Sequence, residues 1–116
     1  MKIPYHYSLE VAHRVVDKIN LSKNVAKNVC IQSWANGREQ GLCIQVENSG
    51  EWLKICVAQQ RSSDSILIVV GQDGEFDSHN MPSEAVWANR VTFNPDKQKE
   101  AANYIKKQIM ECWKDN

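Results

Sequence analysis

The 116-residue chain lacks the features that mark several large protein classes. It has no apolar run that approaches the roughly 20 residues of a membrane-spanning helix. Its first residues, MKIPYHYSLE, lack the apolar segment of a secretory signal. No two of its four cysteines have the CxxC spacing of zinc or thioredoxin-like sites. We therefore expect a cytoplasmic protein with reduced thiols and no membrane partner.

An excess of charge of either sign is also lacking. Lysine and arginine total 14, aspartate and glutamate total 14, and the two kinds alternate in stretches such as DKQKEAANYIKK. A neutral chain has no general attraction for phosphate backbones, so we expect no nucleic-acid partner. The composition, 42% hydrophobic and 24% charged, is typical of a folded protein, and the length predicts one domain over residues 1–116.

Apolar residues at helical spacing predict one helix near each end of the chain. The first is expected from a cap at Ser8 to about Asn20. The second is expected to open at Asn94, with Pro95 in its first turn and an apolar stripe that includes Ile105. Both helices are amphipathic and each has one side to bury.

Between the two helices the apolar period changes to two, which predicts strands with one buried face. The strands are expected near residues 28–35, 39–47 and 52–59, followed by ILIVV and, as a fifth candidate, VWANRVTF. Asn-Gly and Asn-Ser-Gly sequences supply the first two turns. The sequence thus predicts an α+β fold: an N-terminal helix, an antiparallel meander of four or five strands, and a C-terminal helix in a two-layer sandwich.

The two turns suggest a register for three cysteines. With residues 36–37 at the centre of the first hairpin, Cys30 lies opposite Cys43; with residues 49–50 at the centre of the second, Cys43 lies opposite Cys56. If both turns were tight two-residue turns, this register would make Cys43 a non-hydrogen-bonded partner of both neighbouring strands. A residue of a middle strand cannot have that position on both sides. One turn is therefore expected to be a four-residue loop or to contain a bulge.

The sheet face that carries these cysteines, here called the cysteine face, is neither a clean core nor a clean solvent face. Three interpretations stay open: a half-covered face on which cysteine acts as a small hydrophobe, an apolar patch covered by a second subunit or another protein, and a metal or redox site. The candidate binding surface comprises Trp34, Glu47, Trp52, Lys54, Cys30, Cys43 and Cys56.

A long polar stretch after the fourth strand offers an alternative site. Residues 71–85 read as an irregular loop in which Asp73, Asp77, His79 and Glu84 supply polar groups. Their spacing superficially follows a calcium loop, but Ser78 stands where such a loop needs glycine. A pocket between this loop and the cysteine face could hold a small molecule or a metal.

These observations favour a non-enzymatic binding or interaction module, either a homodimer or the partner of another protein, without a cofactor or a bound metal. The tryptophans would serve as apolar anchors. No residue stands out as catalytic, because no spacing brings a histidine to a thiol. The alternative is a small-molecule or metal-binding protein, or an enzyme, with its pocket between the cysteine face and residues 71–85.

Overall fold

A computed structural model of the chain describes residues 4–36, 39–59 and 64–114. The chain forms one five-stranded antiparallel sheet in the order β1-β2-β3-β4-β5, so each strand pairs with the next along the chain. The elements in order are α1 (Pro4–Asp17), α2 (Lys23–Ala26), β1 (Val29–Asn36), β2 (Glu39–Asn48), β3 (Glu51–Gln59), β4 (Ile66–Gln72), η1 (Asp73–Glu75), α3 (Glu84–Trp87), β5 (Val91–Phe93) and α4 (Gln98–Lys114). The expected α+β fold is confirmed.

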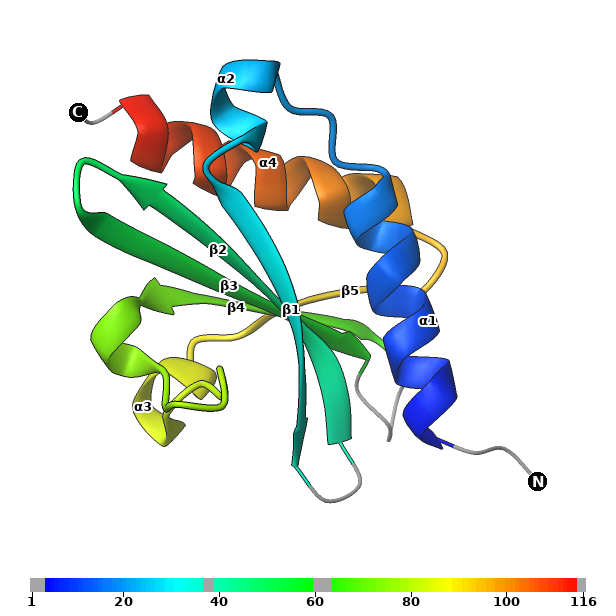
Figure 1. Cartoon of the computed structure of the whole chain (residues 1–116). Coiled ribbons are helices and arrows are strands. Elements are labelled where there is room, and N and C mark those ends of the chain that lie inside the picture. Colours follow the sequence, from blue (N-terminus) through cyan, green and yellow to red (C-terminus); the bar gives the residue numbers. More distant parts are fainter. Residues whose placement is uncertain (1–3, 37–38, 60–63, 115–116) are drawn as a thin grey trace.

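Helices α1 and α4 cover the same face of the sheet (Figure 1). The buried residues between the two layers form the main core, and they include Val15 of α1, Ile44 and Ile55 of the sheet, and Ile105 of α4, each at most 1% exposed. Burial of one aliphatic side chain of this size contributes about 1.5–3 kcal/mol, so this layer dominates the stability of the fold.

Both long helices begin elsewhere than the sequence predicts. α1 starts at Pro4 instead of Ser8, since proline is tolerated in a first turn, and it ends at Asp17. α4 starts at Gln98 instead of Pro95, because Asn94 forms a turn before the helix. In that turn the Asp96 amide donates to Asn94 Oδ1 at 3.3 Å.

The expected register of the first hairpin is wrong, whereas that of the second is confirmed. Cys43 lies opposite Cys56, but Cys30 lies opposite Gln45 and not opposite Cys43. The Glu47 amide donates to the Asn28 carbonyl at 3.1 Å and extends the observed ladder.

This shift resolves the conflict in hydrogen-bond alternation without a longer loop or a bulge. In the second turn Ser49 and Gly50 have φ angles of 55° and 84°, the left-handed values that a tight two-residue turn requires. The first ladder ends at the pair Asn36–Glu39, and Gly37 of the predicted turn lies outside the described residues. With these two registers, the backbone N–H and C=O groups of successive β2 residues bond alternately to β1 and to β3, as an antiparallel sheet requires.

The second face of the sheet is covered by residues 73–90, here called the covering segment. The sequence predicts an irregular loop over residues 71–85 and a strand over VWANRVTF. Instead, the covering segment contains η1 and α3, and only Val91–Phe93 forms a strand. Ser83 caps α3 by accepting a hydrogen bond from the Val86 amide. The covering segment lies opposite α1 and α4 (Figure 1) and buries a second cluster: Trp34, Cys43, Cys56, Ala58, Val69, Phe76 and Val86.

Gly41 makes room for Trp34 in this second cluster. The two residues are cross-strand partners, and the indole lies over the bare glycine backbone. A Cβ atom added at Gly41 would lie 2.6 Å from the Val57 carbonyl oxygen and 2.8 Å from the indole ring. The glycine is therefore required by packing, since real Cβ atoms do not approach so closely.

Gly41→Ala should consequently destabilise the fold by overpacking, by about 1–3 kcal/mol in urea unfolding. Gly74→Ala is the matched control, because a Cβ atom there meets nothing within 4 Å. Equal stability of the two variants would contradict the close packing of Trp34 on Gly41.

Candidate functional site

Most of the expected binding surface is buried within the chain itself. Trp34 is 4% exposed, Lys54 is 7% exposed, and Cys43 and Cys56 are not exposed at all. The covering segment supplies the contacts, with Phe76 and Val86 as its buried residues. These four positions agree with the first of the three interpretations, in which the cysteine face is covered and cysteine acts as a small hydrophobe.

Asn80 attaches the covering segment to three strands at once. Its Nδ2 donates to Gln32 Oε1 of β1 at 2.8 Å. Its Oδ1 accepts from Gln45 Nε2 of β2 at 3.1 Å and from Lys54 Nζ of β3 at 3.3 Å. Asn80 also has a φ angle of 65°, a left-handed conformation that asparagine tolerates better than most residues. One side chain thus fixes both the position of the segment and its turn.

Lys54 is held in place by groups of the covering segment. Its Nζ lies 2.8 Å from Asp73 Oδ1 and 5.9 Å from the centre of the Phe76 ring. A buried ammonium group requires such partners, because the loss of hydration is otherwise too costly. Lys54 therefore serves the attachment of the segment and does not present its charge to solvent.

The Cys43 thiol is chemically quiet in this environment. Burial raises its pKa from 9.0 to about 11, and the positive charge of Lys54 only partly opposes the increase. A thiol in this state is protonated at neutral pH and is a poor nucleophile and metal ligand.

Three expected surface residues remain at least partly accessible. Trp52 is 40% exposed, Cys30 is exposed, and Glu47 is half-buried. Trp52 lies opposite Glu47 on neighbouring strands, and Glu47 Oε1 accepts a hydrogen bond from the Gly50 amide. The structure therefore does not join Trp52 to Trp34 in one exposed patch.

The polar residues of the alternative pocket are engaged separately. Asp77 Oδ1 accepts hydrogen bonds from the backbone amides of His79 and Met81, at 2.8 and 3.0 Å. The bond from Met81, followed by that from His79, lowers the pKa of the Asp77 carboxyl. Asp73 pairs with Lys54, and Glu84 begins α3. In the described part of the chain, no three histidine, cysteine, aspartate or glutamate residues are grouped as a metal site.

The open edge of β1 is a candidate site that the sequence prediction did not name, although the predicted meander places this strand at an edge of the sheet. Within the described residues, this eight-residue strand pairs only with β2. Because the ladder continues through Glu47 N and Asn28 O, even-numbered residues of β1 direct their backbone groups toward β2. The N–H and C=O groups of Val29, Ile31, Ser33 and Ala35 therefore point outward.

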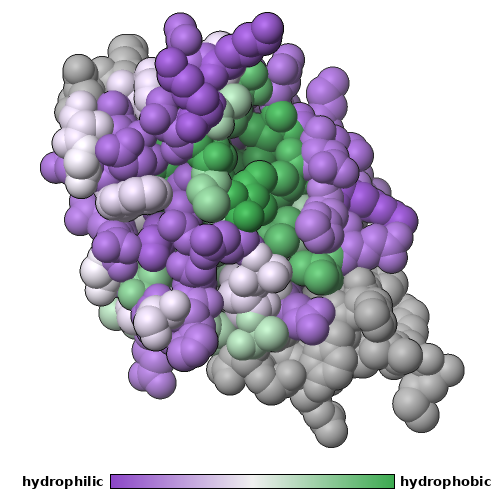
Figure 2. Space-filling model, viewed as in Figure 1, coloured by the Kyte–Doolittle hydropathy of each residue, from purple (hydrophilic) through white to green (hydrophobic). Residues whose placement is uncertain are grey.

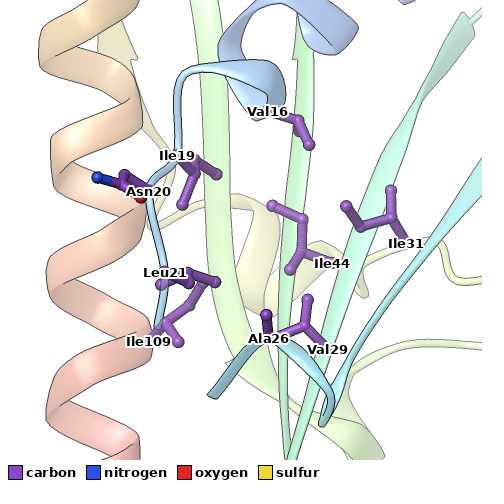
Figure 3. A pocket seen from close by; sticks show the side chains of 9 residues that line it. All are labelled: Val16, Ile19, Asn20, Leu21, Ala26, Val29, Ile31, Ile44 and Ile109. Atoms are coloured by element: carbon purple, nitrogen blue, oxygen red, sulfur yellow. The ribbon is translucent and has the colours of Figure 1, made fainter. Parts of the chain in front are cut away.

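An apolar cavity of about 300 Å³, here called the β1 pocket, adjoins this edge. Ile44 and Ile109, both buried in the main core, line it together with Val29 and Ile31 of the edge strand (Figure 3). The remaining lining residues come from α1, the α1–α2 connection and α2: Val16, Ile19, Asn20, Leu21 and Ala26. Figure 2 shows apolar side chains gathered in this region of the surface, with hydrophilic residues around them.

Ile31 links the edge to the pocket. It is 46% exposed, more than any other large hydrophobic residue of the described chain. Its backbone N–H and C=O groups point outward from the open edge, while its side chain lines the pocket. A strand added to β1 would therefore meet both unpaired backbone groups and an apolar surface.

Comparisons with models of known protein families, with curated proteins and with solved structures find no match to this chain. Among the described helices, none combines the length and the apolar character needed to cross a membrane. The site must therefore be interpreted from its own geometry.

Asn80→Ala should detach the covering segment locally, since three side-chain hydrogen bonds are lost. We expect a loss of about 2–3 kcal/mol in urea unfolding. Asn80→Gly should lose about 1 kcal/mol less, because glycine adopts the left-handed conformation without strain. His79→Ala, at an exposed neighbouring position, is the control; equal effects of all three variants would contradict this role of Asn80.

The raised pKa of Cys43 predicts a loss of stability at high pH. The unfolded thiol ionises near pH 9.0 and the folded thiol near pH 11, so this contribution is complete below pH 9 and decreases between those values. Its magnitude is on the order of 2 kcal/mol. Urea unfolding at pH 8 and pH 10.5 should show a smaller decrease for Cys43→Ala than for the wild type. The same decrease in both proteins would show that the Cys43 thiol does not cause the loss of stability at high pH.

Proposed function

We propose that this protein is an interaction module that binds an extended polypeptide segment along the open edge of β1. The observation that carries the proposal is the position of the β1 pocket beside a strand edge whose outward backbone groups have no strand partner among the described residues. An added strand gains affinity from main-chain hydrogen bonds and selectivity from alternate side chains that enter a pocket.

The composition of β1 supports this use of its edge. Its sequence, VCIQSWAN, contains neither a charged residue nor a proline. In natural sheets, lysine, proline, a bulge or a covering loop usually prevents a long edge strand from pairing with another chain. The strand at the other edge, β5, is three residues long and therefore offers a much shorter template. An unprotected edge of eight residues is unusual unless it has a partner.

The lining of the β1 pocket indicates the kind of side chain that it would accept. Among the lining residues that the structure describes, Asn20 is the single polar one, and the others are aliphatic. Aliphatic side chains at alternate positions of a bound segment would fit this lining and exclude water from Ile31. Charged side chains would be disfavoured, because none of the described lining residues carries an opposite charge to compensate their desolvation.

The expected partner protein is thus retained, but the proposed surface moves from the cysteine face to the β1 edge. Trp52 remains exposed on β3, away from this edge. Cys30 is exposed in β1 itself, between Val29 and Ile31, but its side chain belongs to the cysteine face and not to the pocket. A cytoplasmic location belongs to the same proposal and is supported by the exposed Cys30 thiol and the buried, protonated Cys43 thiol, which fit a reducing compartment.

A small apolar ligand is the second candidate function. It is favoured by the cavity volume of about 300 Å³, which lies at the lower limit of ligand pockets. Its experimental signature differs, since such a ligand would raise the thermal stability without requiring the backbone groups of β1.

Selection of random peptides displayed on phage against the folded protein tests the proposal. We expect enriched sequences with aliphatic residues at alternate positions and no proline. Ile31→Lys should weaken their binding about tenfold or more, since it places a charge at the rim of the pocket. Trp52→Lys is the matched control, because Trp52 is similarly exposed on the other sheet face. No enrichment by the protein in its monomeric state, or equal binding to both variants, would contradict the proposal.

A further inference from the structure

We infer that a second copy of this chain occupies the β1 edge, with the two β1 strands antiparallel about a two-fold axis at the centre of the strand, near Gln32 and Ser33. This inference rests on the proposed function and names the partner of the same edge. It joins two five-stranded sheets into one continuous sheet.

The first argument is the distribution of side-chain size along β1. The side chains that share a face with the helices are bulky in the first half, Val29 and Ile31, and small in the second half, Ser33 and Ala35. An antiparallel two-fold places the first half of one strand against the second half of the other. Ile31 of each copy then meets Ser33 or Ala35 of the other, so the strand complements itself in shape.

The second argument is the absence of charge. A two-fold axis brings each group close to its own copy, so any charged residue at the centre of β1 would face a like charge. Gln32 and Ser33 at the centre are neutral, and the strand as a whole has no charged residue. The pairing therefore meets no electrostatic opposition along the strand.

The third argument concerns the backbone. The outward N–H and C=O groups of Val29, Ile31, Ser33 and Ala35 include donors and acceptors in equal number. In an antiparallel ladder two residues that both point outward exchange both of their hydrogen bonds. A second copy of β1 matches this pattern over the same length, and it brings a second exposed Ile31 to the same interface.

The interface is expected to be of modest strength. Edge pairing buries less surface than the roughly 1,200–2,000 Å² of a standard stable complex unless adjacent apolar groups contribute. The rim of the β1 pocket supplies that contribution. We therefore expect a reversible equilibrium between monomer and dimer that depends on protein concentration.

Sedimentation equilibrium of the full chain over a range of concentrations tests the inference. Ser33→Pro removes an outward N–H donor without removing a hydrogen bond to β2, and proline is tolerated on edge strands for that reason. We expect it to raise the dimer dissociation constant about tenfold or more, since the symmetry removes two donors. Ser33→Ala keeps the donor and should dimerise as the wild type does.

Two results of sedimentation would overturn the inference. One is a wild type that stays monomeric at every concentration. The other is a folded Ser33→Pro variant that dimerises as strongly as Ser33→Ala. Circular dichroism and urea unfolding establish whether the proline variant is folded.

Disulfide cross-linking covers the case in which the proline variant does not fold. In a Cys30→Ser background, Gln32→Cys or Ser33→Cys should form a covalent dimer on oxidation, because residues opposite themselves at the axis lie within disulfide distance. Thr92→Cys, on the exposed strand β5, is the control. If neither central position cross-links faster than position 92, the inference is wrong.

Failure of this inference and failure of the proposed function give different results. A monomeric wild type that still selects strand-like peptides through Ile31 overturns self-pairing and leaves the proposed function intact. If the dimer forms, the same peptides should dissociate it, because both occupy one edge. A monomer that selects no peptides overturns both proposals.

Discussion

The packing of the covering segment on the cysteine face is the interaction that determines which surface of the sheet remains open. The five-stranded sheet has two faces, and the helices α1 and α4 cover only one of them. Asn80 bonds to β1, β2 and β3 together, and Lys54 pairs with Asp73 in the same segment. The apolar indole of Trp34 and the Cys43 thiol would otherwise face water.

Coverage of both faces determines which surface is left for binding. Because residues 73–90 bury most of the expected binding surface, the cysteine face offers little beyond Trp52 and Cys30. The edge of β1 is different, since α1 ends at Asp17 and the chain reaches the strand through the short α2. The two layers are open at this edge, and the β1 pocket lies between them. The packing of the covering segment on one sheet face therefore leaves the β1 edge as the main accessible surface of the sheet.

The sequence predicts those parts of the fold that local patterns determine. The strands, the second hairpin and the apolar stripe of α4 follow from periods of two and of three to four residues, and the structure has them. The first hairpin register failed, because the Asn-Gly signal is local whereas the ladder must also satisfy the alternation set by β3. The role of Asn80 depends on partners 26 to 48 positions away, which no local pattern encodes. The pocket likewise combines residues of α1, the α1–α2 connection, α2, β1, β2 and α4.

Residue-resolved amide hydrogen exchange along β1 tests most directly the claim that this edge is the open surface of the molecule. In dilute solution the inward amides of Gln32 and Trp34 should exchange slowly, and the outward amides of Ile31 and Ser33 should exchange fast. As the protein concentration rises, protection should extend to the outward amides. Equal protection of all four amides at the lowest concentration would contradict the account, because the edge would then be covered by the chain itself.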